Sequence, residues 1–340
     1  MTATEIQPQT TRAHEVFGDF WFNSEPVIIS ALRGRVVLIQ FWDYTCGSCL
    51  RALPYVNEWY KRYREHGLVV IGVHTPKFPF GKNPEYVQKA IERSGISYPV
   101  VMDNEAVIAA RYDNRDWPTT YLIDKHGFIR YKSTGEGQYA TTERVLQTLL
   151  YDAGVFDEMP MLMDPLREED RAGSVLYRST PELFAGYLKG SIGNVEGYAP
   201  ESAVNYDDPD FYLGDRIYAV GVWMNDRNSL RHYEHETGKI ILRYHALGVN
   251  VVAKPEGDST IEVVVTQDGE FLTGENRGND IEIDTEGKSV IAITEPRMYN
   301  LVKNPAYGEH VLRLVTESDA FSLYSFTFVS SVIPELISNN

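Results

Sequence analysis

In the first 150 residues, short runs of apolar residues alternate with segments in which apolar residues recur every three or four positions. Residues 36–42 form a nearly continuous apolar run rich in β-branched side chains, which predicts a buried central strand. From position 46 onward, apolar residues recur at spacings of three and four until Gly67, which predicts an amphipathic helix. A second buried strand is expected over 68–73. The chain therefore begins its fold with a strand, a helix and a second strand.

The same alternation continues to residue 151. We expect further helices over 84–94, 104–112 and 141–151, and further strands over 99–102, 119–123 and 128–132. Strands that alternate with helices and end in a hairpin and a helix predict a mixed α/β sheet flanked by helices. We assign this α/β domain to residues 1–152.

The remainder of the chain has a different pattern. Residues 153–212 show little periodicity and many Pro, Gly, Asp and Tyr, so we expect a connecting segment that is largely packed down, with a short helix over 181–188. Residues 213–340 contain at least seven short strand-like runs separated by turn residues. Such spacing predicts an all-β jelly-roll or sandwich domain.

Charge is distributed unevenly over the 340 residues. The formal net charge is −16, of which the first 150 residues contribute +1 and the remaining residues −17. A surface this acidic repels phosphate backbones and anionic lipid, so no nucleic-acid partner is expected. No run approaches the roughly 18 apolar residues of a membrane span, and residues 1–14 lack the apolar core of a signal peptide. The sequence as written predicts a soluble, cytoplasmic protein.

Cysteine usage indicates the chemistry. The chain contains two cysteines, Cys46 and Cys49, which are too few for a disulfide-stabilised scaffold, and a zinc site normally needs a second pair of ligands. We therefore expect no metal and no cofactor. A Cys-x-x-Cys run between a strand and a helix is typical of thiol–disulfide exchange. A fixed structural disulfide, or a pair of inert core thiols, is the alternative.

The position of Cys46 at the first turn of a helix explains how it would act. Unpaired N–H groups and the helix dipole favour an anion there, which lowers the pKa of a thiol from about 8.5. The thiolate attacks a substrate disulfide, and the more buried Cys49 then releases the product.

The segment from Val37 to Pro54 resembles the active-site segment of the thioredoxin superfamily. The similarity is greatest to its TlpA-like branch, and within it to the redoxin domain of DipZ-type proteins; residues 21–24, 55–60, 70–76 and 117–124 agree as well. Residues 296–302 resemble part of the carbohydrate-binding-module-like β-domain that follows that redoxin domain. The resemblance implies a thioredoxin-like fold for residues 1–152.

The resemblance also implies roles for individual residues. Cys46 and Cys49 would form the redox-active disulfide, Pro118 would be a cis-proline facing it, and Trp117 would contact the substrate. Trp42 would shield the disulfide. The residues expected to support the active site are Trp42, Thr45, Gly47, Ser48, Trp117 and Pro118.

Partners and location also follow from the resemblance. The implied partners are proteins that carry a disulfide or a dithiol, together with a separate electron donor, since the membrane-spanning donor domain of DipZ is absent from this sequence. Relatives mostly work outside the cytoplasm, so an extracytoplasmic location is the alternative.

Two positions depart from the family pattern. Gln40 stands where thioredoxins carry a buried Asp, and Lys77 stands where the related branches often carry an acid. A water or another group must therefore accept the Cys49 proton. We expect His74 and Lys77 to be neighbours of the Cys46 thiolate, and Lys77 to stabilise it.

Two other chemistries are less compatible with the motif. His74 could complete a Cu(I) site with the two cysteines, but copper-binding relatives space their cysteines by three residues. A peroxidase would carry Thr at position 43, which is Asp43 here.

The β-domain offers its own candidates for binding. Trp223, Tyr233 and Tyr244 could stack on sugars, although core positions are the stronger expectation. Acidic clusters at 207–210 and 280–284 could hold Ca²⁺, but a solvated acidic face is the stronger expectation. We therefore predict a two-domain thiol–disulfide oxidoreductase. The alternative is a binding protein whose β-domain recognises a glycan or a protein and whose redoxin domain is accessory.

Overall fold

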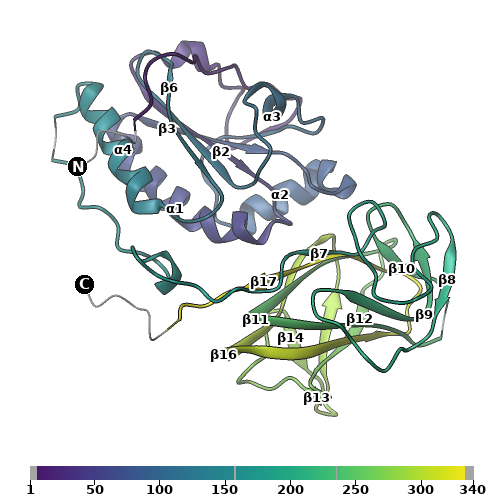
Figure 1. Ribbon diagram of the computed structural model, residues 1–340. Coiled ribbons are helices and arrows are strands. Elements are labelled where there is room, and N and C mark those ends of the chain that lie inside the picture. Colours follow the sequence, from purple (N-terminus) through teal and green to yellow (C-terminus); the bar gives the residue numbers. More distant parts are fainter. Residues whose placement is uncertain (1–5, 157, 235, 334–340) are drawn as a thin grey trace. The chain divides into compact units, whose positions relative to one another are not determined.

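The computed structural model describes residues 6–156, 158–234 and 236–333. The chain divides into two compact units, residues 1–172 and 173–340, and Figure 1 shows one α/β unit and one β unit. Each unit is described by itself below. No helix within the described residues is long and apolar enough to cross a membrane.

The first unit is built on a six-stranded sheet in the order β1-β4-β3-β2-β5-β6. Strands β2, β3 and β4 pair in parallel, whereas β1, β5 and β6 pair antiparallel with their neighbours. The predicted mixed sheet is therefore confirmed. The strands are β1 (Trp21–Phe22), β2 (Val36–Trp42), β3 (Leu68–His74), β4 (Val100–Met102), β5 (Thr119–Ile123) and β6 (Ile129–Thr134).

Helices cover both faces of this sheet (Figure 1). Apolar side chains of α1, α2 and α4 share one core with one set of alternate β2 residues, and those of α3 share a second core with the other set. Every residue of β2 is buried, which explains its continuous apolar run. The helices are α1 (Gly47–Tyr63), α2 (Pro84–Arg93), α3 (Val107–Arg111) and α4 (Tyr139–Asp152), with short 3₁₀ turns η1 (Ile29–Leu32), η2 (Arg64–His66), η3 (Pro79–Lys82) and η4 (Glu168–Asp170).

The start of the expected connecting segment packs within the first unit. Glu143, on α4, is fully buried and accepts hydrogen bonds from the Tyr63 hydroxyl at 2.6 Å and from the Met163 backbone N–H at 2.8 Å. Its carboxylate also pairs with Arg62 at 2.9 Å. Residues 153–172 are thereby tied to the helices of the α/β unit.

A second group of polar contacts joins the same segment to the active-site helix. Tyr55 of α1 donates to Asp170 at 2.7 Å and stacks on Tyr139 with ring centres 3.6 Å apart. Arg167 pairs with both Asp170 and Glu136. Residues 153–212 are therefore not one linker, because residues 153–172 belong to the first unit.

The second unit is a large sheet in which every ladder between named strands is antiparallel. The helix predicted over 181–188 is wrong: strand β7 lies there and pairs with β17. The strands are β7 (Leu183–Phe184), β8 (Ala203–Tyr206), β9 (Ile217–Asn225), β10 (Leu230–His232), β11 (Gly238–Pro255), β12 (Ile261–Gln267), β13 (Glu270–Phe271), β14 (Ile281–Ile283), β15 (Ser289–Ile293), β16 (Arg297–Thr316) and β17 (Phe321–Val329).

Two long strands organise this sheet. β11 pairs with β16 along most of its length, and on its other edge it pairs first with β9 and then with β17. The sequence pattern predicts two separate strands over the β11 region, at 239–245 and 250–253. The structure joins them through register shifts around Gly248, because a β-bulge allows a strand to bend without ending.

We expect Glu143→Ala to lower the free energy of unfolding of the first unit by about 3 kcal/mol. The change leaves the Tyr63 hydroxyl and the Met163 N–H without their acceptor and removes the carboxylate that pairs with Arg62. Urea denaturation of the full chain, followed by tryptophan fluorescence, measures this, since four of the five tryptophans lie in that unit. Glu58→Ala is the control, because the exposed Glu58–Lys61 pair at 3.7 Å contributes under about 1 kcal/mol. Equal losses in the two variants would contradict the prediction.

Candidate active site

Cys46 lies where the central strand ends and the first helix begins. After β2, a turn begins at Asp43, whose carbonyl accepts the Cys46 backbone N–H at 3.2 Å. Cys46 is the N-cap of α1, and its sulfur accepts the Cys49 backbone N–H at 3.2 Å. The expected position at the N-terminus of a helix is confirmed.

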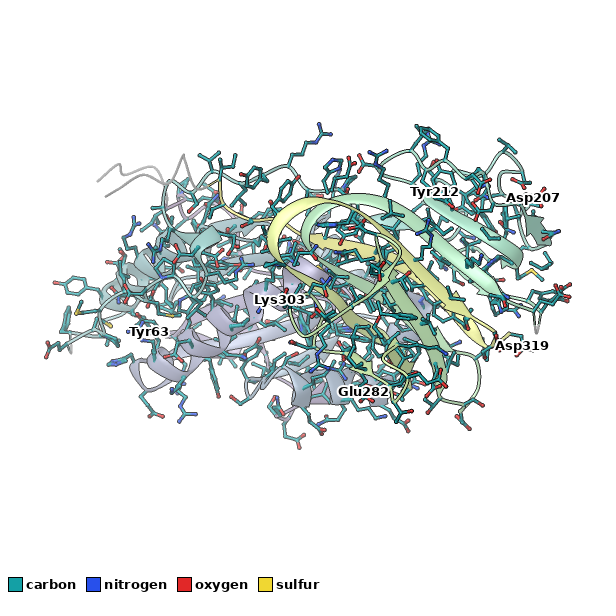
Figure 2. All side chains as sticks on the ribbon, turned by 90° about the horizontal axis from the view of Figure 1, so that it is seen from below. Tyr63, Asp207, Tyr212, Glu282, Lys303 and Asp319 are labelled. Atoms are coloured by element: carbon teal, nitrogen blue, oxygen red, sulfur yellow. A yellow bond between two sulfur atoms is a disulfide. The ribbon has the colours of Figure 1, made fainter. Side chains whose placement is uncertain are left out.

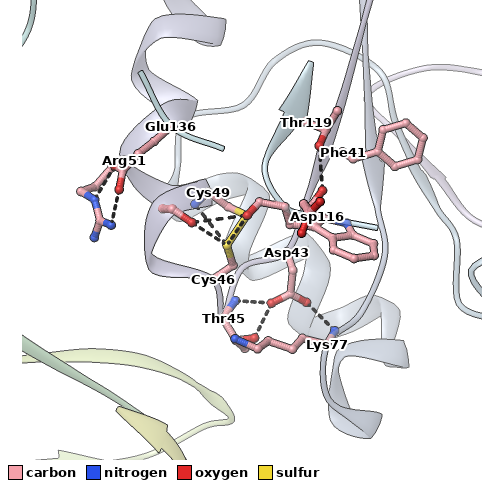
Figure 3. The surroundings of a disulfide bond; sticks show 12 residues. Phe41, Asp43, Thr45, Cys46, Cys49, Arg51, Lys77, Asp116, Thr119 and Glu136 are labelled. Atoms are coloured by element: carbon pink, nitrogen blue, oxygen red, sulfur yellow. Dashed lines mark hydrogen bonds and ion pairs between the residues drawn. A yellow bond between two sulfur atoms is a disulfide. The ribbon is translucent and has the colours of Figure 1, made fainter. Parts of the chain in front are cut away.

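The two cysteines form a disulfide, as Figure 3 shows. Cys46 is 8% exposed and Cys49 is 1% exposed. Cys46 therefore carries the outer sulfur, and Cys49 the inner one. This difference matches the order in which an attacking and a resolving cysteine act.

The environment of the Cys46 sulfur favours a thiolate once the disulfide is reduced. An N-cap side chain faces the unpaired N–H groups of the first helical turn and the positive end of the helix dipole. The Cys49 N–H already points at this sulfur, and the Ser48 hydroxyl lies 3.3 Å from it. Each of these groups stabilises a negative charge on Cys46.

The loop that precedes β5 lies across the motif. The Trp117–Pro118 peptide bond is cis, as the family resemblance implies. The Trp117 carbonyl oxygen lies 3.9 Å from the Cys46 sulfur and 3.5 Å from the Ser48 hydroxyl. The structure thus brings two segments about 70 residues apart together at the disulfide.

The other predicted supporting residues surround the motif. Trp42 is fully buried and packs in the same apolar core as both cysteines. Gly47 is the first residue of α1. Thr45 is buried and bonds to the Asp43 carboxylate through its backbone N–H at 2.6 Å and through its hydroxyl.

Gln40 is buried in β2 and cannot act as a carboxylate. Its side-chain oxygen accepts the Thr120 hydroxyl at 2.6 Å, and its amide nitrogen donates to the Phe41 carbonyl at 3.4 Å. The amide thus has local partners in place of the carboxyl group that thioredoxins carry at this position.

The two predicted thiolate neighbours both contact Asp43. The Lys77 backbone N–H donates to its carboxylate at 3.1 Å, while the Lys77 ammonium lies 5.7 Å from the Phe78 ring centre. The Nε2 atom of His74 lies 3.5 Å from the same carboxylate. The described residues contain no cluster of three or more His, Cys, Asp or Glu that could hold a metal ion.

Sequence reasoning missed two features near the disulfide. Asp43 was considered only as the residue that replaces Thr, yet it is a buried carboxylate with several partners. Arg51, two residues after Cys49, forms a bidentate pair with Glu136 at 2.8 Å (Figure 3). Burial raises the pKa of Glu136, but Arg51 and Arg167 outweigh it and hold that pKa below its ordinary value. An acidic residue at the end of an apolar strand was the available signal for Asp43.

The candidate ligand residues of the β unit are mostly structural. Trp223 and Tyr244 are fully buried, and Tyr233 is about half exposed. In the acidic clusters, Asp280 pairs with Arg297 at 2.7 Å. Asp207, Glu282 and Asp319 are exposed and lie at the periphery in Figure 2. The aromatic residues thus mainly build the core.

Comparisons with known proteins agree with this site. Residues 19–132 match the AhpC/TSA family, and residues 180–328 match the family described as thioredoxin like C-terminal domain. The chain is 37% identical to Protein DipZ of Mycobacterium bovis over 247 residues, 71% of this chain and 34% of that protein. It therefore spans about a third of the length of DipZ, and the matched stretch is longer than either compact unit.

Two further similarities concern smaller parts of the chain. A thiol-disulfide oxidoreductase ResA of Geobacillus kaustophilus is 33% identical over 121 residues, 36% of this chain and 67% of that protein. A solved structure of a thiol-disulfide isomerase from Corynebacterium glutamicum is 26% identical, with a TM-score of 0.36, over 41% of this chain and 96% of that one. Because the ResA similarity covers two thirds of that protein and the α/β unit carries a Cys-x-x-Cys disulfide where its helix begins, the chain belongs to the thioredoxin-like family of thiol-disulfide oxidoreductases.

Proposed function

We propose that this protein exchanges its Cys46–Cys49 dithiol or disulfide with the disulfides or dithiols of partner proteins. One observation carries the proposal: the outer sulfur of the pair is the N-cap of α1 and accepts a backbone N–H. A thiolate at this position is stabilised without any metal or cofactor. The activity is assigned to the first unit.

In the reducing direction, the exchange transfers two electrons to the substrate. The Cys46 thiolate attacks one sulfur of a substrate disulfide, forms a mixed disulfide and displaces the other substrate sulfur as a thiolate. Cys49 then loses its proton and attacks the Cys46 sulfur. This step re-forms the intramolecular disulfide and releases the second substrate thiolate. A separate dithiol protein or a small thiol restores the reduced pair, and the oxidising direction reverses these steps.

We expect Cys46→Ser to abolish exchange and Cys49→Ser to accumulate the mixed disulfide, because the inner thiol is then missing. Reduction of a disulfide-bonded test protein, read by alkylation and mass spectrometry, measures both effects. The wild-type chain, treated identically, is the control. Full activity of Cys46→Ser would overturn the proposed mechanism.

The same assay, run in glutathione and dithiothreitol buffers, gives the midpoint of the couple. A midpoint near about −270 mV indicates a reductase, and one near about −120 mV indicates an oxidant. The absence of a reversible couple in the wild-type chain would remove the redox function.

We also propose that the Lys77 ammonium stabilises the Cys46 thiolate. Lys77→Ala keeps the backbone N–H that binds Asp43 and removes one positive charge, so the pKa of Cys46 should rise by about half a unit. The pH dependence of Cys46 alkylation measures this pKa. Lys61→Ala, on the exposed surface of α1, is the control and should leave the pKa unchanged. An unchanged pKa in Lys77→Ala would contradict the proposal.

A second candidate function rests on a hollow in the β unit. Its volume is about 360 Å³, and its lining includes the polar residues Gln267, Asn276, Asn304, Tyr307 and His310. Amide and imidazole groups, together with the ring of Tyr307, are the kinds of group that contact the hydroxyl-rich surface of a sugar. We propose that this hollow binds a glycan, as the resemblance to a carbohydrate-binding module implies.

Calorimetric titration of the full chain with cellobiose, maltotriose and chitobiose tests this second function. We expect Asn276→Ala to weaken binding of the responsive sugar at least tenfold, about 1.4 kcal/mol, by removing hydrogen bonds. Phe211→Ala, a change in an exposed aromatic of the same unit outside the lining, is the control and should bind normally. No heat with any of the three sugars would remove the proposal.

A further inference from the structure

A buried carboxylate lies three residues before the outer cysteine. Asp43 is 2% exposed, and an ionised carboxylate at such a site is costly unless it is paired and hydrogen-bonded. The exchange steps above do not use this group, and its position directly before the motif needs an explanation.

The Asp43 carboxylate connects two segments of the redox site. One oxygen accepts the Thr45 backbone N–H and the Thr45 hydroxyl, within the turn that leads to Cys46. The other oxygen accepts the Lys77 backbone N–H, beyond β3, at 3.1 Å. Burial raises the pKa of Asp43, but His74 and these hydrogen bonds outweigh it, so the pKa lies below its ordinary value. The group is therefore a buried anion at neutral pH.

His74 faces this anion from the next strand. It is fully buried at the end of β3, opposite Trp42 of β2 in the parallel register. Its ring stacks on Tyr44 with centres 5.4 Å apart and meets Trp42 edge-on at 5.3 Å. Among the described residues, neither ring nitrogen has a hydrogen-bond partner. The Asp43 carboxylate lies 3.5 Å from Nε2, so it is placed to balance a proton on this buried imidazole.

The pair is coupled to the nucleophile through the backbone and through its charge. The Asp43 carbonyl accepts the Cys46 N–H, and Asp43 also fixes the intervening Thr45 (Figure 3). Asp43, Thr45 and Cys46 are all buried, so a charge in this turn is weakly screened, and a negative charge there disfavours a thiolate on Cys46. A proton on His74, 3.5 Å from the carboxylate, would offset that effect.

On the basis of the proposed exchange, we propose that Asp43 and His74 are positioning residues that set the thiolate stability of Cys46 through opposing charges. Asp43 holds the turn in place and would by itself destabilise the thiolate. His74 neutralises Asp43 and so keeps the reduced form accessible.

Because the two charges oppose each other, removing one or the other should shift the pKa of Cys46 in opposite directions. Asp43→Asn keeps an oxygen for the Thr45 bonds and removes the charge, so the pKa of Cys46 should fall by about half a unit, a threefold change in ionisation. His74→Phe keeps the aromatic packing and removes the counter-charge, so that pKa should rise by a similar amount. The equilibrium with glutathione should move toward the dithiol in Asp43→Asn and toward the disulfide in His74→Phe.

Asp103→Asn is the matched control. Asp103 is also a buried carboxylate of the same unit, but it accepts hydrogen bonds from Ile108, Ala109 and Thr75 and not from the turn before Cys46. Its replacement lowers stability and should leave the pKa of Cys46 and the glutathione equilibrium at wild-type values. This comparison separates an electrostatic effect on the sulfur from general loss of packing.

The experiment uses the full chain, with Cys46 alkylation against pH and glutathione titration as readouts. Shifts of opposite sign in Asp43→Asn and His74→Phe, with none in Asp103→Asn, support the inference. The inference would be overturned if the pKa of Cys46 shifted in the same direction in Asp43→Asn and His74→Phe, or by the same amount in Asp103→Asn. An unchanged pKa in active variants would also overturn it. If Asp43→Asn does not fold, the inference is tested with His74→Phe and His74→Gln. A higher pKa of Cys46 in these two variants supports the inference, and an unchanged pKa overturns it. A wild-type chain without a reversible couple would instead remove the proposed function itself.

Discussion

The redox chemistry of this protein depends on holding the Cys46 sulfur at the N-terminus of α1. That position is fixed by β2, which ends just before the turn to α1. All seven residues of β2 are buried, and the strand is hydrogen-bonded to β3 and to β5. Because the helix begins directly after the strand and turn, the Cys49 N–H of its first turn faces the sulfur. The inner sulfur of Cys49 lies below it in the apolar core.

Two buried carboxylates of the first unit, those of Asp43 and Glu143, each accept several hydrogen bonds. Asp43 joins the active-site turn to the end of β3, while Glu143 joins α4 to the segment after it. In both cases the carboxylate connects segments far apart in sequence. Since a partnerless buried charge is strongly destabilising, these contacts also determine where flanking segments pack. For the same reason, residues 153–172 belong with the α/β unit.

The β unit is stabilised mainly by long paired strands and by a core with many aromatic residues. Its long strands β11 and β16 each pair with several neighbouring strands, and Trp223, Tyr244 and Tyr299 belong to the buried core of the unit. The acidic excess of the second half is accommodated outside this core, where exposed carboxylates remain hydrated. A hollow of about 360 Å³, lined by residues that include Gln267, Asn304 and His310, lies within this unit.

The sequence by itself determined the mixed α/β fold, the all-β second unit and the place of the Cys46-x-x-Cys49 run between a strand and a helix, because these depend on local periodicity and on short spacings. The cis bond before Pro118 followed from family resemblance and not from the pattern. Only the tertiary structure decided that β11 continues through a bulge, that residues 153–172 pack on α1 and α4, and that His74 faces Asp43. These contacts join residues far apart along the chain, and hydrophobic periodicity carries no information about which distant polar groups will meet.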